Sequence, residues 1–222
     1  MNNQIAKKFD TLSLLKFTLP SMIMMLFMAL YQMVDAVFVS NFVSETALSA
    51  LNIVYPLISF IIAVAIMLAT GGSAVIAKKM GEGEHALARQ LFSMVVLIGV
   101  LFGIAMTLVG IFFTRPLIHL MGSTPALDPY CYDYLYTLML FSPFAVLQLL
   151  FQTFFITAGK PHLGLVVTVL AGIANIFFDF LFIVVIPLGV KGAAYGTAIG
   201  YCIPAIFGLI FFSLDRNGSL RF

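Results

Sequence analysis

Long runs of apolar residues, separated by short polar stretches, dominate the pattern along the chain. Four intervals contain no charged residue: Thr46–Ala77 with 32 residues, Gln90–Thr114 with 25, Tyr134–Gly159 with 26 and Gly192–Leu214 with 23. Each is longer than the roughly 20 residues that carry an α-helix across the hydrocarbon core of a bilayer. The apolar residues are continuous and do not alternate with polar ones, which excludes a transmembrane β-barrel.

Two further apolar stretches are each interrupted by a single acidic residue. Phe17–Ser40 contains Asp35, and Pro161–Val190 contains Asp179. Together with the four uncharged intervals they predict an all-α membrane protein, a six-transmembrane-helix bundle that forms one lobe over residues 1–222. The helices are expected at about residues 15–39, 50–76, 91–113, 134–157, 163–186 and 193–214.

Composition supports lipid as the solvent of this chain. Hydrophobic residues make up 62% and charged residues 9%, whereas an ordinary soluble domain is about half apolar and a quarter charged. A soluble enzyme, a disordered chain and a nucleic-acid binder are excluded, and the bilayer is an expected partner. The two cysteines, Cys131 and Cys202, form no CxxC and indicate neither a disulfide scaffold nor a metal site.

The basic residues predict which way the bundle faces. If both termini are cytoplasmic, the outer side holds only Arg115 and Lys191. The inner side then holds the other nine basic residues, which are Lys7, Lys8, Lys16, Lys78, Lys79, Arg89, Lys160, Arg216 and Arg221. Nine against two follows the positive-inside rule, so we expect both termini in the cytoplasm.

Asp35 and Asp179 are the two charged residues that fall well inside predicted spans. At 1.5 Å per residue, Asp35 lies about 7 Å and Asp179 about 12 Å below the outer helix ends. A charge near the bilayer centre costs about 2.5–3.5 kcal/mol, so such residues are usually functional and face the protein interior. The alternative is simple hydration near the interface. Asp35 could reach water in that way, but Asp179 could do so only through a cavity.

Polar residues surround these two acids. Asn175 and Asp179 are four residues apart and share one helix face, as do Tyr31 and Asp35. Thr197 lies about 7 Å deep on the sixth predicted helix. Three helices therefore offer oxygen ligands in the outer half of the bundle. Such hard ligands suit Na⁺ or a proton better than a soft transition metal.

Two carboxylates held close in a low dielectric cannot both stay ionised unless a cation joins them. We therefore expect Asp35, Asn175, Asp179 and Thr197 to form a site for a coupling cation, with Tyr31 in support. The hydroxyls of Thr197 and Tyr31 have an alternative, which is to bond a helix carbonyl or a neighbouring helix.

Other features have mainly structural interpretations. We interpret Gly192, Gly196 and Gly200 as a packing stripe that also helps to place Thr197. Pro56, Pro143 and Pro204 are candidates for helix bends. Gln148 and Gln152 either line an internal cavity or hydrogen-bond across helices. The tyrosines before and within the fourth span, which we interpret as an aromatic belt at the headgroup level, are Tyr130, Tyr132, Tyr134 and Tyr136.

Five segments carry a resemblance to a known family. In chain order they are Leu19-Pro20 through Tyr31-x-x-x-Asp35 to Ser40, Lys79-Met80-Gly81-Glu82-Gly83 leading to Ala88-Arg89, Phe151-Gln152 followed by Ala158-Gly159-Lys160-Pro161, Asn175-x-x-x-Asp179, and Gly192-Ala193-Ala194-x-Gly196-Thr197-Ala198. They resemble, in this order and at these spans, the N-terminal half of the multidrug and toxic compound extrusion (MATE) transporters.

This resemblance implies a membrane transporter and not an enzyme. The expected activity is secondary antiport that exports amphiphilic organic or cationic drugs in exchange for Na⁺ or H⁺, with no cofactor beyond the coupling ion. The matching positions imply that Asp35, Asn175, Asp179 and Thr197 bind the cation, as metal ligands if it is Na⁺. Tyr31 and Gln152 would support the site. The expected location is the plasma membrane of a prokaryotic cell, as a multi-pass protein.

The family has twelve helices in two six-helix lobes, so the resemblance also implies a second lobe, either a C-terminal half or a second copy of the chain. Two alternatives remain open from the residues. A flippase for lipid-linked precursors would share the fold, but it usually needs basic residues in its cavity, and none lies within these spans. A non-transporting six-helix subunit would bind a partner and show no cation-dependent stability.

Overall fold

The computed structural model of the chain describes residues 11–214, 220 and 221, and within these residues the regular elements are all helical. The elements are α1 (Thr11–Phe42), α2 (Glu45–Gly81), α3 (His85–Leu120), α4 (Asp128–Leu140), α5 (Ser142–Thr157), α6 (Pro161–Asp179), the π-helix η2 (Phe180–Val185) and α7 (Val190–Leu214).

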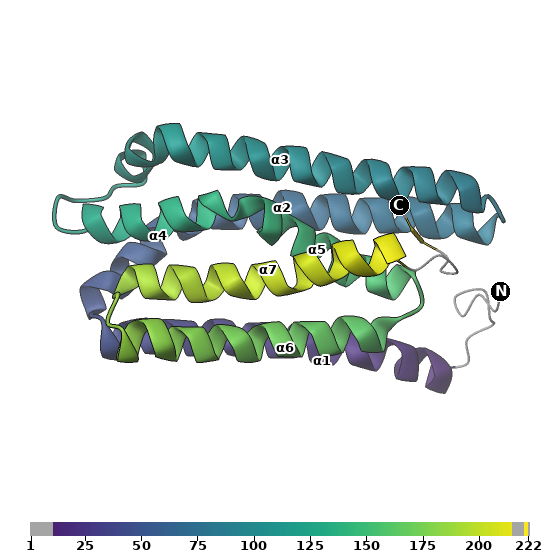
Figure 1. The fold of residues 1–222 in the computed structure, drawn as a ribbon, viewed down its shortest axis with the longest axis horizontal. Coiled ribbons are helices and arrows are strands. Elements are labelled where there is room, and N and C mark those ends of the chain that lie inside the picture. The colour runs from purple at the N-terminus through teal and green to yellow at the C-terminus, as the bar shows by residue number, and fades with distance from the viewer. Residues whose placement is uncertain (1–10, 215–219, 222) are drawn as a thin grey trace.

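Within the described residues, the helices provide up to six membrane crossings. Five stretches are long and apolar enough to span a membrane by themselves, and α4 and α5 together form a sixth crossing that is bent by 56°. Successive crossings run in opposite directions, so that the first turn of α1 and the last turn of α7 lie at the same end of the bundle (Figure 1). The predicted all-α, six-helix membrane bundle is confirmed.

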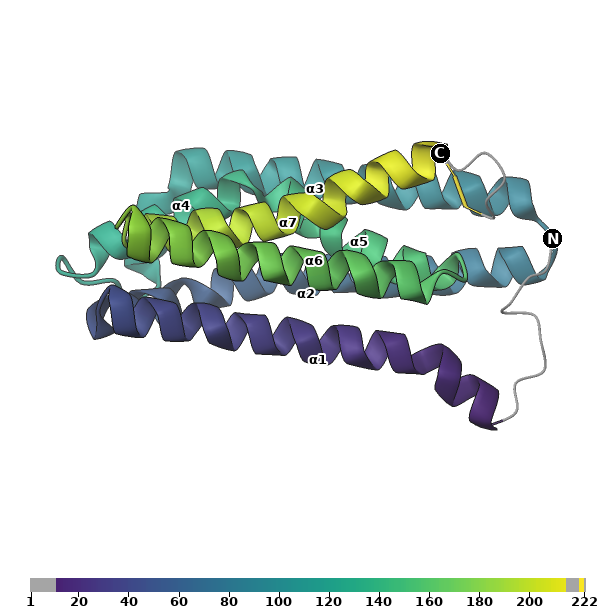
Figure 2. The same ribbon diagram turned by 60° about the horizontal axis from the view of Figure 1, so that its bottom comes forward.

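The bent pair α4 and α5 occupies the middle of the molecule. It packs against α2, α3 and α7, whereas α6 packs on α7 and α1 packs mainly on α6. Figure 2 shows α1 as the outermost helix on this side, with α6 between it and the rest of the bundle. Polar residues of α1, α6 and α7 are therefore brought together at one side of the central pair.

The prediction of one continuous fourth helix over residues 134–157 is wrong in its middle. Pro143 has no N–H, so the carbonyl oxygen of Met139 loses the partner that a regular helix would give it. The hydroxyls of Thr107 and Ser142 donate to that oxygen instead, at 2.9 and 2.8 Å. At Gly103 a side-chain carbon would collide with Pro143. The neighbouring helix α3 thus supplies both a hydrogen bond and the space for the bend.

The fifth predicted helix, over residues 163–186, also changes its character near its end. Regular α-helix stops at Asp179, and η2 continues the span with π-type geometry. The backbone N–H of Ile186 donates to the carbonyl oxygen of Leu181 at 2.9 Å, a five-residue step. Single π-turns inside helices are frequent at functional sites, and this one begins directly after Asp179.

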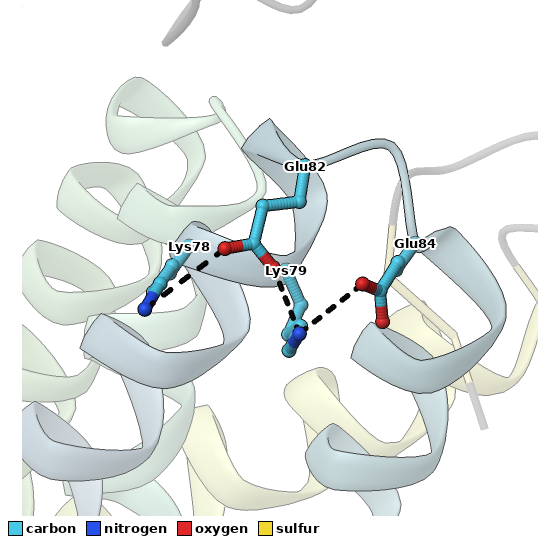
Figure 3. A network of polar contacts seen from close by, with 4 residues as sticks. All are labelled: Lys78, Lys79, Glu82 and Glu84. Atoms are coloured by element: carbon cyan, nitrogen blue, oxygen red, sulfur yellow. Dashed lines mark hydrogen bonds and ion pairs between the residues drawn. The ribbon is translucent and has the colours of Figure 1, made fainter.

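Charged residues gather at the two ends of the bundle. At the predicted inner end, Lys79 pairs with Glu82 at 2.8 Å and with Glu84 at 3.2 Å, and Lys78 lies 3.9 Å from Glu82 (Figure 3). The hydrogen bond from the Lys79 ammonium group lowers the pKa of the Glu82 carboxyl. Arg115 and Lys191 belong to the opposite end. Of the nine basic residues predicted on the inner side, those outside the described residues are Lys7, Lys8 and Arg216.

Candidate functional site

Asp179 is fully buried at the junction of α6 and η2. Its carboxylate lies directly against the backbone of α7 at Gly196, where a side-chain carbon would collide with Oδ1 of Asp179. Both oxygens of the carboxylate are buried and accept no hydrogen bond. A buried carboxylate with no partner is costly, so this position calls for a chemical explanation.

The glycine stripe of α7 meets α6 and η2 at three successive levels. A side-chain carbon at Gly192 would come within 2.6 Å of the carbonyl oxygen of Phe182, and one at Gly200 would touch the Cβ atom of Asn175 at 3.4 Å. Gly196 lies between them, against Asp179. The predicted packing role is therefore accompanied by close approach of α7 to the polar residues of α6.

A small cavity links α1, α6 and α7 one turn below Asp179. It has a volume of about 10 Å³, and its walls include Tyr31, Asn175 and Thr197. The ring of Tyr31 lies over Gly172, where a side-chain carbon would come within 2.9 Å of it. Asn175 is 2% exposed, and its side-chain oxygen accepts no hydrogen bond. This volume is close to that of a single water-sized probe.

A larger cavity of about 170 Å³ adjoins the first and contains Asp35 in its wall. Thr197 lines both cavities and its side chain lies beside the carboxylate of Asp35. Asp35 and Asp179 are close enough to interact electrostatically. The structure thus brings together Asp35, Asn175, Asp179 and Thr197, with Tyr31 beside them.

The oxygens of this group share one unusual property. Buried side-chain oxygens that find no hydrogen-bond partner include those of Asp35 (Oδ1), Asn175 (Oδ1), Asp179 (Oδ1 and Oδ2) and Thr197 (Oγ1). Most buried polar atoms in folded proteins are paired. Such a concentration of unpaired acceptors from three helices is the arrangement that a small cation or a proton would satisfy. Among the described residues, no group of three or more His, Cys, Asp or Glu side chains is arranged to hold a metal ion.

Tyr134 and Tyr201 are site residues that the sequence interpretation missed. Tyr134 is 7% exposed, lines the larger cavity, and lies near Thr197 and both carboxylates. Tyr201 lines both cavities. The interpretation of Tyr134 as part of an aromatic belt is therefore wrong. Successive tyrosines in this group are two residues apart, which is a rotation of about 200° around the helix axis and places them on nearly opposite faces. The four tyrosines therefore cannot all face the lipid.

The two glutamines of α5 take different roles. Gln152 is buried and its Nε2 donates to the Thr168 hydroxyl at 3.1 Å, so it connects α5 to α6 and does not touch the acids directly. Gln148 is 4% exposed, lies beside the Tyr31 side chain, and leaves its Oε1 unpaired.

Comparison with known proteins agrees with this architecture. The MatE protein family matches residues 20–181 of the chain. The chain belongs to the MATE family. The MATE chain is 25% identical, over 90% of its length, to the multidrug export protein MepA of Staphylococcus saprophyticus, and it covers 44% of that protein. It is also 25% identical to MepA of Staphylococcus haemolyticus, covering 46% of it.

Solved MATE structures have the same fold. The MATE multidrug transporter DinF-BH superposes with a TM-score of 0.88 at 26% identity, over 93% of this chain and 47% of that one. A MATE crystal structure in the straight conformation gives 0.90 at 23% identity, over 99% of this chain and 49% of the other. This MATE chain therefore spans about half the length of the relatives it matches. Its family and its membrane spans make it a multi-pass protein of the plasma membrane.

Proposed function

We propose that this chain is the cation-binding lobe of a secondary multidrug exporter that works by Na⁺ or H⁺ antiport. The observation that carries the proposal is the group of buried, unpaired oxygens from Asp35, Asn175, Asp179 and Thr197. Leaving a buried acceptor unpaired costs about 1–3 kcal/mol, and more for a charged group. A bound cation would recover that cost for several oxygens at once.

The types of ligand favour a small, hard cation. Carboxylate, amide and hydroxyl oxygens suit Na⁺, and a carboxylate can equally take up a proton. The two carboxylates repel each other across a low-dielectric site, so binding of one positive charge is coupled to both. In this proposal Asp35 and Asp179 supply the charge, and Asn175 and Thr197 complete the set of ligands.

The larger cavity is the side of the site that faces the drug. Its wall combines the Asp35 carboxylate and the Asn52 amide with the aromatic rings of Tyr55, Tyr134 and Tyr201. Aromatic faces and a carboxylate attract amphiphilic organic cations. The relatives are multidrug export proteins, which supports drug-like substrates for this chain. A second six-helix lobe, from a C-terminal half or a second copy, would complete the substrate path.

The exchange then follows from competition for the same negative charge. A cation that enters from the outside binds between Asp35 and Asp179, lowers their combined charge by one and weakens the attraction that Asp35 offers to a drug in the adjoining cavity. The drug leaves to the outside, and release of the cation to the inside restores the carboxylates. Thr197 lines both cavities, so a movement of its side chain when the cation binds also changes the wall of the drug-facing cavity.

The proposal is tested in the intact transporter, reconstituted in liposomes with a fluorescent lipophilic cation as the drug substrate. Asp35→Asn and Asp179→Asn should each lower cation-driven export by about tenfold or more, because each variant loses one of the two carboxylates that hold the cation. Asp133→Asn is the matched control, since Asp133 pairs with Lys191 at 3.3 Å near the outer helix ends and should export at the normal rate.

Separate Na⁺ and pH gradients identify the coupling ion. Normal export by both Asp35→Asn and Asp179→Asn, with folding intact, would contradict the proposal. Export that collapses equally in the Asp133→Asn control would show that the loss is not specific to the buried pair.

A further inference from the structure

A second set of buried polar groups lies between the candidate cation site and the inner end of the bundle. Gln148 and Gln152 stand one helical turn apart on α5, and Thr168 of α6 accepts a hydrogen bond from Gln152. All three side chains are at most 6% exposed. Polar groups in the membrane interior are expensive and usually functional, and the proposed exchange at the two carboxylates does not use these three.

The buried polar side chains of this region and of the cation site lie at regular intervals along the helix axes, and we call these intervals steps. Counted along their own helices from the inner helix ends, Gln152 and Thr168 lie at about 8–10 Å, Gln148 at about 14 Å, Asn175 at about 21 Å and Asp179 at about 27 Å. The successive levels are about 4–7 Å apart. A partly dehydrated ion or a short chain of waters can pass between oxygens at such spacing.

Contacts connect neighbouring steps. Gln148 lies beside Tyr31, and Tyr31 lines the 10 Å³ cavity together with Asn175 and Thr197. Below Gln148, the amide of Gln152 donates to Thr168 at 3.1 Å. The Oε1 atom of Gln148 is buried without a hydrogen-bond partner. The unpaired acceptors of the cation site therefore continue inward past Tyr31.

A tightly packed cluster of aromatic rings lies next to the innermost of these steps. Phe155 lies against Gly164, one turn before Thr168, and its ring centroid is 5.3 Å from that of Phe212. Phe92 and Phe212 approach to 4.9 Å. The cluster is fully buried and consists of Phe92, Phe151, Phe154, Phe155 and Phe212. In this conformation Gln152 and Thr168 reach the inner third of the bundle, beside this cluster.

We propose that Gln148, with Gln152 and Thr168, forms an inner relay through which the coupling cation leaves the site toward the cytoplasm. The inference rests on the proposed function. The shared ligand chemistry is a small monovalent cation, either Na⁺ or a hydrated proton. The amides and the hydroxyl neither gain nor lose a proton. Each offers an oxygen to the passing ion, and the aromatic cluster must open before the ion reaches the inner water.

The test separates binding of the cation from its release. Gln148→Met keeps the length of the side chain and removes the amide. In the intact transporter it should keep the cation-dependent rise in melting temperature, while cation-driven export in liposomes falls about tenfold. Gln148→Asn, which restores an amide oxygen, should recover most of that rate. Leu147→Met is the matched control, because Leu147 is equally buried on the same helix.

Thr168→Val provides a second variant of unchanged volume, and it removes the partner of Gln152. Like Gln148→Met, it should slow export, whether a Na⁺ gradient or a pH gradient drives the wild-type protein. Export within about twofold of wild type in both Gln148→Met and Thr168→Val would overturn the relay. So would parallel loss of cation-dependent stabilisation, since that makes Gln148 a ligand or a packing residue.

The two proposals fail in different ways. If Asp35→Asn and Asp179→Asn leave export and stabilisation unchanged, the cation site itself is wrong. If those variants fail as expected while Gln148→Met transports normally, only the relay is wrong.

Discussion

At the scale of single residues, the missing side chain of Gly196 matters as much as the carboxylate it faces. The Asp179 carboxylate lies against the backbone of α7 because nothing projects from position 196. Small residues in membrane helices commonly allow close packing. Here the same feature places Thr197, the next residue, beside the acid on α1. The glycine therefore acts as a positioning residue for the proposed site.

We predict that Gly196→Ala removes cation-dependent stabilisation of the purified protein. The added methyl group collides with Oδ1 of Asp179 and displaces the carboxylate from its place against α7. Melting temperatures in detergent, with and without Na⁺ and at neutral and acidic pH, measure the effect. Gly71→Ala is the control, since a side-chain carbon there meets no atom within 4 Å. An unchanged cation response in Gly196→Ala would show that the carboxylate does not need this position.

At the scale of helices, the break between α4 and α5 is stabilised by its neighbours. Pro143 frees the carbonyl oxygen of Met139, and hydroxyls from two helices satisfy it again. In lipid no water is available for that carbonyl. The Ser142 hydroxyl oxygen also lies 2.8 Å from the carbonyl oxygen of Gly103, so its single proton is shared between the two carbonyl groups. The bend is thus specified jointly by a proline, two hydroxyls and a glycine.

Removal of the two hydroxyls should destabilise this joint. Thr107→Val and Ser142→Ala should each lower the free energy of unfolding by about 1 kcal/mol, as expected for one net hydrogen bond. The double variant should lose more than the sum of the two, because it leaves the Met139 carbonyl without a partner. Thermal melts in detergent measure the loss, with Ser213→Ala as the control at an exposed position near the end of α7. A double variant as stable as the wild type would show that the bend does not need these bonds.

At the scale of the whole molecule, the four proposed ligands lie in one lobe. Asp35, Asn175, Asp179 and Thr197 come from α1, α6 and α7 of this chain. In the proposed function, binding of the cation therefore does not require another lobe, whereas export does, because alternating access moves one lobe against another. The lobe should respond to the cation by itself.

We predict that the purified 222-residue chain melts at a higher temperature in Na⁺ than in K⁺, or at acidic than at neutral pH, according to its coupling ion. A ligand that binds only the folded state stabilises it by about 2.7 kcal/mol at about 100 times its Kd. The chain carrying Asp179→Asn should lose most of this response. A wild-type chain indifferent to both ions would favour a six-helix subunit without a cation site.

The sequence by itself determined the class of the protein, its six crossings and the two acids that lie inside them. These properties depend on one physical fact, that lipid tolerates apolar side chains and excludes charges, so each residue could be judged without knowledge of its neighbours in space. The convergence of Asp35, Asn175, Asp179 and Thr197 was accessible for the same reason, since polar groups at similar depths in a bundle turn away from lipid.

Only the tertiary structure decided the features that depend on contact between helices. The bend at Phe141 depends on Thr107 and Gly103 of α3, and the inward orientation of Tyr134 follows from how α4 is rotated against α7. The place of Gln148 beside Tyr31 depends on how α5 and α1 approach each other. Hydropathy is a property of one segment at a time. A pair of packed helices, in contrast, determines how each is rotated, how closely the backbones approach and which group pairs with a freed carbonyl. The residue pattern along a single helix does not contain this information.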